Sequence, residues 1–373
     1  MLFEYELKVS RGAHPDFESA HGSSPVDGAS VSEVDDTLKF FGSNEDLATA
    51  VDRVVEVAKL ALSSKCQFFS LDDAVLSVSS ERGESEEIAQ AVQTYLPRLR
   101  NALPRYRDNP YIALVDDAFA EGGRAERAAH RWLSKKDIPS RSTSDTLAKR
   151  LNRAIREMRT ESTGAVFRRK LKKFTRSSDK NRRELDSYID MLFEKRARLL
   201  VVRVDLTYRK RVDGPGAAER RLQMSLVKSD WSKMYRALQT DLSEIELEGF
   251  AYKIEYGPEK KFHIHAMLLL DGSKVRKGVS IARRVGEWWK KIVPDGQGLY
   301  FNCNAKRYAY AALGVIDWND EKKREILSKF VVSYLTKPDM YLPLVMDGER
   351  RFGKGNTARK VSQRGRRRAG QEP

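Results

Sequence analysis

The amino-acid sequence predicts an α+β protein, in which an antiparallel sheet of the split β-α-β type follows a mostly helical N-terminal region. Two observations support this fold class. Between about residues 197 and 345, short runs rich in β-branched residues alternate with helical stretches, whereas the residues before 196 carry helical periodicity without such runs. With 373 residues, the chain is long enough for two or three domains.

The sequence divides into four segments. Residues 1–120 are acidic and mostly helical, with helical apolar spacing over 47–58 and no catalytic constellation, so their role is unassigned. Residues 121–196 form a basic helical region, and residues 197–345 form the α+β domain. Residues 346–373 are a basic tail, whose end lacks any apolar pattern and is expected to stay disordered until it meets a polyanion.

Within the third segment the expected element order is β-α-β-β-α-β, as in RRM-like and ferredoxin-like sheets, with helices on one face. The predicted extended segments are 199–208, 249–256, 262–270 and pieces of 299–317. The predicted helices are 222–241, 280–292 and about 320–337. We expect Asn319 to cap the last of these helices and Pro338 to end it.

Charge is distributed unevenly along the chain. There are 69 Lys and Arg against 53 Asp and Glu, a net charge of +16. Residues 1–120 carry a net −10, which leaves +26 for the remainder. A basic region of this size attracts polyanions by counterion release, so nucleic acid is the expected partner and a basic surface kept for solubility is the alternative. No basic amphipathic helix is joined to a lipidation signal, so no membrane partner is expected.

Two broad classes of protein are excluded. No window approaches 18 consecutive apolar residues, and the start, MLFEYELKVS, lacks a basic stretch followed by an apolar run. Neither a membrane-spanning nor a secreted protein is therefore predicted. The two cysteines, Cys66 and Cys303, are too few for a disulfide framework or a zinc–cysteine site. These features predict a protein of a reducing compartment.

Strand alternation places polar side chains together on one exposed face of the predicted sheet. These residues are Arg203, Asp205, Thr207, Lys253, Glu255, His263 and His265. A five-residue loop between the second and third strands sets Glu255 opposite His263 and diagonal to His265, about 5–8 Å apart. The spacing predicts a metal site of two histidines and one carboxylate, with Asp205 as the alternative acidic ligand. Two surface histidines that bind nothing are the simpler interpretation.

A second pattern lies in the helix before Pro338. Tyr334 and Lys337 are three residues apart, so their side chains share a helix face. The Lys337 ammonium can favour the phenolate and neutralise charge that develops on a phosphate. A tyrosine nucleophile, whose ordinary pKa is about 10, needs such help at neutral pH. A metal held by two histidines and a carboxylate would polarise a phosphodiester from the other side.

Together these motifs resemble the HUH endonucleases, in which a His-hydrophobic-His strand and a Tyr-x-x-Lys helix cleave single-stranded DNA. The sequence is most similar to one branch, the gene-two-type replication initiation proteins of filamentous phages (inoviruses) and their prophage relatives. The matching blocks are RVDLTY (203–208), EYGPEKKFHIHAMLLLDGS (255–273), GLYFNCN (298–304), SYLTKPDMYL (333–342) and RRFGKG (350–355). The resemblance covers about 150 residues and does not reach the first 195.

The resemblance implies a rolling-circle replication initiator that nicks single-stranded or origin DNA. Glu255, His263 and His265 would bind Mg²⁺ or Mn²⁺, and Tyr334 would attack, with Lys337 as its charge partner. The products would be a 5′-phosphotyrosine link and a free 3′-hydroxyl. The implied partner is single-stranded or supercoiled origin DNA, host replication proteins are further candidates, and the implied location is the cytoplasm of a bacterial host.

Several assignments stay open. Tyr341 is either a second nucleophile or a packed aromatic residue. The residues expected to contact DNA phosphates are Arg203, Lys253, Arg350, Arg351, Arg366, Arg367 and Arg368. A non-catalytic DNA-binding regulator or prophage remnant, and a relaxase or transposase of the same superfamily, are alternative functions. The complete set of Glu, His-x-His and Tyr-x-x-Lys favours a nicking enzyme, because a pure DNA-binding protein needs no metal triad.

Overall fold

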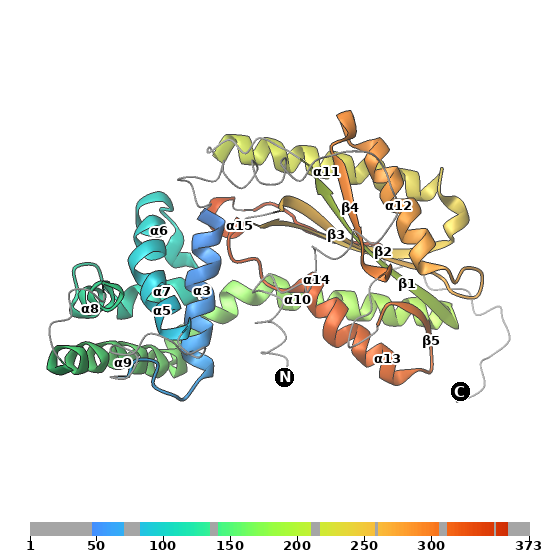
Figure 1. Cartoon of the computed structure of the whole chain (residues 1–373). Coiled ribbons are helices and arrows are strands. Elements are labelled where there is room, and N and C mark those ends of the chain that lie inside the picture. Colours follow the sequence, from blue (N-terminus) through green and yellow to red (C-terminus); the bar gives the residue numbers. More distant parts are fainter. Residues whose placement is uncertain are drawn as a thin grey trace. The chain divides into compact units, whose positions relative to one another are not determined.

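The structure is a computed structural model, and Figure 1 shows the whole chain. It describes residues 47–70, 83–134, 141–209, 217–257, 260–305, 312–346 and 348–356. The chain separates into two compact units. The first runs to Phe174 and includes Pro343–Val345, and the second comprises Thr175–Leu342 and the residues from Met346 onward. This division falls inside one long helix, α10 (Ala165–Lys195), whereas the segments predicted from the sequence end at residues 120, 196 and 345.

The first unit is helical, as the sequence predicts. Before α10 its helices are α3 (Leu47–Ser63), α5 (Gly83–Gln90), the π-helical Ala91–Tyr95, α6 (Leu96–Ala102), the 3₁₀ turn Tyr106–Asp108, α7 (Pro110–Ala118), α8 (Arg124–Leu133) and α9 (Arg141–Thr163). The apolar spacing predicted over 47–58 corresponds to the buried side of α3, which includes Val51 and Val54, and α9 likewise buries Leu151 and Ile155. Residues 11–30, a stretch of mostly polar residues with three glycines, lie outside the described residues.

The second unit is built on a six-stranded antiparallel sheet. Its strands are β1 (Arg198–Tyr208), β2 (Leu247–Gly257), β3 (Lys261–Asp271), β4 (Gly298–Asn302), β5 (Gly314–Asp317) and β6 (Phe352–Lys354). The strand order is β4-β1-β3-β2-β6, and β5 also pairs with β1. The three long strands lie where the sequence predicts them. Strand β6 was not expected, because the sequence analysis assigned its residues to the tail, of which 357–373 lie outside the described residues.

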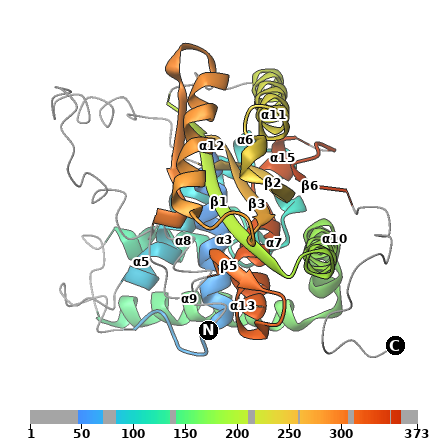
Figure 2. The ribbon, with the colours of Figure 1, turned by 90° about the vertical axis from the view of Figure 1, so that its right-hand side faces the viewer.

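Helices cover both faces of this sheet, whereas the sequence analysis expected them on one (Figures 1 and 2). One face packs against α11 (Ala217–Gln239) and α12 (Gly278–Ile292). There the Trp231 ring of α11 lies 4.5 Å from the Tyr252 ring of β2. The other face packs against the second half of α10 and the last helical segment. Their shared core contains Leu185, Leu192, Val201, Met267, Leu269 and Leu335.

The last predicted helix is interrupted. It consists of α13 (Glu321–Ile326), the π-helical Leu327–Val332 and α14 (Ser333–Thr336). Its N-cap is Asp320 and not Asn319, since the Asp320 carboxylate accepts a hydrogen bond from the Lys323 backbone N–H at 3.0 Å. Lys337 has an extended ψ of 148°, as expected of a residue before proline. Lys337 therefore lies beyond the helix that carries Tyr334.

Short elements complete the described chain. They are the 3₁₀ turns Ser243–Ile245, Pro294–Gly296 and Cys303–Ala305, and the helix α15 (Leu342–Val345). Among the described helices, none combines the length and the apolar composition that crossing a membrane requires.

Candidate metal and tyrosine site

The hairpin of β2 and β3 sets the register of the candidate site. Glu255 is paired with His263 and Lys253 with His265, as the five-residue loop predicts. Strand β1 adds Asp205, which is paired with His265 from the other side. Because side chains alternate along a strand, all five of these residues point to the sheet face that packs against α10.

This polar face is buried, in contrast to the exposed face that the sequence analysis expected. The exposed fraction is 1% for Asp205 and His265, 6% for His263 and 9% for Glu255. The apolar residues that α10 and the last helix pack on the same face explain the difference, because they exclude solvent from it. Buried polar groups need partners, so each of these side chains is expected to be held in a defined position.

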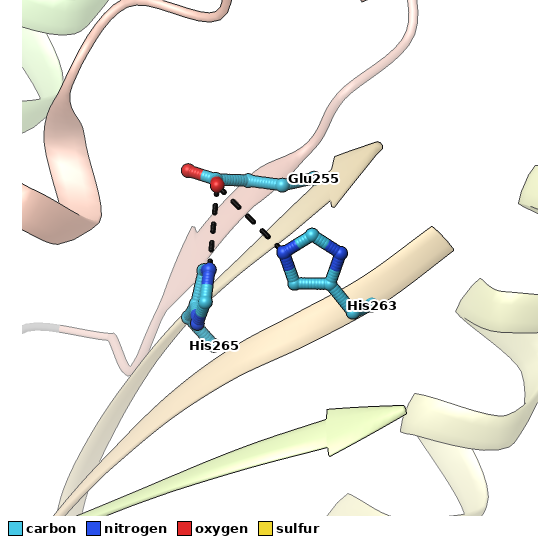
Figure 3. A group of neighbouring side chains, drawn as sticks. All are labelled: Glu255, His263 and His265. Atoms are coloured by element: carbon cyan, nitrogen blue, oxygen red, sulfur yellow. Dashed lines mark ion pairs between the residues drawn. The ribbon is translucent and has the colours of Figure 1, made fainter. Parts of the chain in front are cut away.

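Glu255, His263 and His265 each offer one ligand atom, and these atoms lie within 4.8 Å of one another (Figure 3). The Glu255 Oε2 atom is 3.8 Å from His263 Nε2 and 3.3 Å from His265 Nε2. The Nδ1 atom of His263 lies 2.9 Å from the Lys261 carbonyl oxygen, and Nδ1 of His265 lies 2.7 Å from Asp205 Oδ1. If each Nδ1–H donates to its oxygen, both Nε2 lone pairs face Glu255.

This donor set fits a divalent metal ion. Two imidazole nitrogens and one carboxylate oxygen suit first-row metals, and the hydrogen bonds at both Nδ1 atoms are the supporting contacts that metal-binding histidines ordinarily make. Asp205 contacts the side of His265 that faces away from Glu255, so it orients the ring. Of the two acidic ligands considered, the geometry thus favours Glu255.

Tyr334 lies against this group. Its hydroxyl oxygen is 3.2 Å from His265 Nε2, and the two ring centroids are 5.0 Å apart. Two cations lie over the tyrosine ring: the Arg203 guanidinium carbon at 4.2 Å and the Lys337 Nζ at 4.5 Å from its centroid. Burial raises the pKa of Tyr334 and outweighs the opposing effect of Lys337 and Arg203. Lys337 lowers the pKa of Tyr334, as expected, but not enough to bring it below the ordinary value for tyrosine.

Two lysines hold the Glu255 carboxylate. Lys253 Nζ lies 2.6 Å from Glu255 Oε1 and donates to the Lys337 carbonyl oxygen at 2.7 Å, and Lys337 Nζ lies 3.3 Å from Glu255 Oε2. Burial alone would raise the pKa of Glu255, but Lys253 and Lys337 hold it well below its ordinary value. Lys253 is itself only 5% exposed, and burial lowers its pKa despite Glu255. Because it is enclosed in this way, Lys253 is not the DNA-phosphate contact that the sequence analysis expected.

The other titratable groups are also set by burial and neighbours. Burial alone would raise the pKa of Asp205, but the charges of Arg203 and His265 hold it far below its ordinary value. Burial, followed by repulsion from His265, lowers the pKa of His263 to about 3. His263 is therefore neutral at physiological pH, which is the form that binds metal.

The remaining predicted residues lie apart from this cluster or outside the described chain. Tyr341 is 2% exposed and its ring packs 5.5 Å from the Tyr256 ring, which favours its role as a packed aromatic residue. Arg350 is exposed and its Nε donates to the Phe352 carbonyl, whereas Arg351 is half-buried. Arg366, Arg367 and Arg368 lie outside the described residues.

The sequence did not predict the contacts that Arg203 and Lys253 make within the candidate site. Arg203 was assigned to DNA, but its side chain is 12% exposed, bonds Asp205 at 3.2 Å and stacks on Tyr334. Lys253 was assigned likewise, although it lies directly opposite His265 on the same face. The available signal was its position two residues before Glu255 on the same strand, because that spacing puts both side chains on one face, where the lysine can pair with the carboxylate.

Comparison with known proteins gives one match. Residues 163–355 match the model of a family described as the YagK/YfjJ C-terminal domain. The matched stretch is just over half of the chain and contains every residue of the cluster around Glu255. No curated protein and no solved structure matches the chain significantly.

Proposed function

We propose that this chain, which belongs to the YagK/YfjJ C-terminal domain family, is a metal-dependent nicking enzyme that joins itself to DNA through Tyr334. One observation carries the proposal: a tyrosine hydroxyl lies 3.2 Å from the nitrogen of a histidine that belongs to a two-histidine, one-carboxylate group. A phenol beside a candidate metal site, within a basic chain, is the arrangement that tyrosine attack on a phosphodiester requires.

The connectivity supports the finer fold assignment. The chain passes in order through β1, α11, β2, β3, α12 and β4, and these four strands lie side by side as β4-β1-β3-β2. We assign this arrangement to the split β-α-β, RRM-like class, extended by β5 and β6. On such a sheet the two central strands, β1 and β3, supply Asp205, His263 and His265, so these residues lie on strands that are paired on both sides.

A divalent ion, Mg²⁺ or Mn²⁺, would be held by Glu255, His263 and His265, and the two imidazole nitrogens favour Mn²⁺ over Mg²⁺. A bound divalent ion would supply positive charge at the phosphate that is attacked. Asp205 and the Lys261 carbonyl fix the ring orientations, and Lys253 and Lys337 keep Glu255 ionised. These contacts hold the three ligand atoms in defined positions around a common point.

The proposed reaction exchanges one phosphoester for another. The Tyr334 hydroxyl gives its proton to solvent, its oxygen bonds to phosphorus, and the bond from phosphorus to the 3′ oxygen breaks. That oxygen takes a proton from solvent to become a 3′-hydroxyl, so no proton is gained or lost overall. The 5′ end remains as a phosphotyrosine, so reattack by a 3′-hydroxyl reseals the strand. Such a break and reseal would start and end rolling-circle replication. The cations over the Tyr334 ring favour the phenolate that attacks, against the opposing effect of burial.

The test is formation of a covalent protein–DNA complex. A pool of randomised single-stranded oligonucleotides, and separately supercoiled DNA of the protein's own replicon, is incubated with the protein in Mn²⁺ or EDTA and resolved on a denaturing gel. We expect a shifted protein band in Mn²⁺ alone, which is lost in Tyr334→Phe and His265→Ala but kept in the matched control Tyr341→Phe. A band that survives in Tyr334→Phe, or no band with either DNA while binding is retained, would contradict the proposal.

A further inference from the structure

Helix α10 has a strongly basic exposed surface that the proposed chemistry does not use. Between residues 168 and 183 it carries nine Arg and Lys and a single acid, Asp179. All nine basic side chains are exposed. Because α10 is described along its whole length, this surface can be assigned residue by residue.

The basic residues form a line along the helix. At 3.6 residues per turn, six of them fall within a sector of about 120° that extends about 22 Å along the axis. We call these six the basic stripe: Arg168, Arg169, Lys172, Arg176, Lys180 and Arg183. On the opposite side Phe167 is buried and Leu171 and Phe174 are half-buried, and beyond the stripe Leu185, Ile189 and Leu192 pack against the sheet. The stripe therefore faces away from the core.

The charges of the stripe are not neutralised within the described part of the chain. Lys180 lies 3.6 Å from Glu184, and the other five make no ion pair with any described residue. Side chains at i and i+4 on a helix are neighbours, so like charges there repel and destabilise the helix. The repulsion within the stripe thus lowers the stability of the helix in the isolated protein, and a polyanion bound beside it would relieve that repulsion.

We propose that the basic stripe binds the phosphate backbone of double-stranded DNA without reading its sequence. Guanidinium and ammonium groups in a row suit phosphates, and counterion release supplies the affinity. No aromatic side chain of α10 is exposed, so the stripe lacks the stacking platforms that single-strand binding uses. A membrane surface fits less well, because Val166 is the one exposed large apolar side chain of α10, so this helix has no exposed apolar face that could enter lipid. This inference goes beyond the nicking proposal and stands without it.

The test measures binding of a fluorescent 20-base-pair duplex by the full-length protein in EDTA, as anisotropy against salt concentration. The stripe variant is Arg176→Gln, Lys180→Gln and Arg183→Gln. The matched control removes the same charge from α9, with Lys149→Gln, Arg153→Gln and Arg156→Gln, whose side chains are equally exposed. Each phosphate contact contributes about 0.9 to the slope of log K against log salt. We expect the stripe variant to lose about three units of slope and at least about tenfold in affinity at 0.1 M salt, and the control to change less than twofold.

Three outcomes would overturn the proposal. Equal losses in the stripe variant and the α9 control would show an effect of net charge alone. An unchanged slope in the stripe variant would exclude the stripe as the contact. Stronger competition by single-stranded DNA, double-stranded RNA or phosphatidylserine vesicles than by unlabelled duplex would assign the surface to another partner. A second variant at the other end, Arg168→Gln, Arg169→Gln and Lys172→Gln, must reproduce the loss, which guards against a folding defect in either one.

The EDTA condition separates this test from that of the nicking proposal. Duplex binding needs neither metal nor Tyr334, whereas the covalent complex needs both. A protein that binds duplex through the stripe and never forms a covalent complex would retain this inference and lose the nuclease. If the stripe variant nicks single strands normally and also binds duplex as tightly as the wild type, the nicking proposal stands and the stripe proposal fails.

Discussion

Substitution of Asp205 by Asn isolates the contact that positions a candidate metal ligand. Asp205 Oδ1 lies 2.7 Å from His265 Nδ1, both groups are 1% exposed, and the neighbouring Arg203 is bonded to the same oxygen. The Asn side chain has nearly the same shape but no charge, so it removes the charge assistance of a buried hydrogen bond. Loss of such a supporting carboxylate ordinarily costs 10- to 100-fold in metal affinity, or about 1.4–2.7 kcal/mol.

The assay is titration of Mn²⁺ into the protein by calorimetry at pH 7.5. We expect Asp205→Asn to weaken Mn²⁺ binding by about 10- to 100-fold, and Glu255→Gln, which removes a ligand, to weaken it further. The matched control is Asp230→Asn, because Asp230 is also a buried carboxylate of this unit but contacts Tyr208. Wild-type affinity in Asp205→Asn would refute the positioning role. A loss as large as that of Glu255→Gln would instead make Asp205 a ligand.

Three further predictions follow from the same contacts. Tyr334→Phe should tighten Mn²⁺ binding roughly two- to tenfold, because the Tyr334 hydroxyl competes for His265 Nε2 at 3.2 Å; weaker binding in calorimetry would make the phenol a ligand. Lys253→Met should lower the free energy of unfolding, measured in urea, by about 3 kcal/mol, because it leaves the buried Glu255 carboxylate with Lys337 as its one remaining lysine partner. Combining Lys253→Met with Glu255→Gln should restore most of that stability. If it restores none, the pairing of Lys253 with Glu255 is refuted. The folded-state pKa of His263 is lowered to about 3, so the contribution of this residue to stability is present above its unfolded pKa near 6.5 and is lost as pH falls. The expected loss in the free energy of unfolding is about 2 kcal/mol between pH 7 and pH 5. His263→Asn should remove that part of the pH dependence, and an identical dependence of stability on pH in the variant would contradict the lowered pKa.

The sheet and the metal group could be predicted because their signals are local. Alternation with a period of two assigns each strand residue to a face, and a short hairpin loop fixes the pairing of neighbouring strands. From these two facts alone the pairing of Glu255 with His263 follows, and the structure has it. The helical stripes of α3 and α9 were predictable for the same reason, since the period of 3.6 residues is visible within each segment.

The environment of the site was not predictable, because it depends on elements distant in the sequence. Nothing local to β1 or β3 indicates that α10 packs on their polar face, so the face was expected to be exposed. Because α10 covers this face, Arg203 contacts Tyr334 and Lys253 pairs with Glu255, although both residues were expected to contact DNA. The π-helical turn at Leu327–Val332 also has no clear sequence signal, although it ends two residues before Tyr334 and such turns are frequent at functional sites.

The most direct test of the account identifies the amino acid that carries the DNA. The covalent complex formed in Mn²⁺ is digested with nuclease and trypsin, and the modified peptide is sequenced by mass spectrometry. Trypsin does not cut before Pro338, so the peptide 330–350 contains both Tyr334 and Tyr341, and fragmentation distinguishes them. We expect a nucleotide on Tyr334 alone. A nucleotide on Tyr341, or on any other residue in its place, would contradict it.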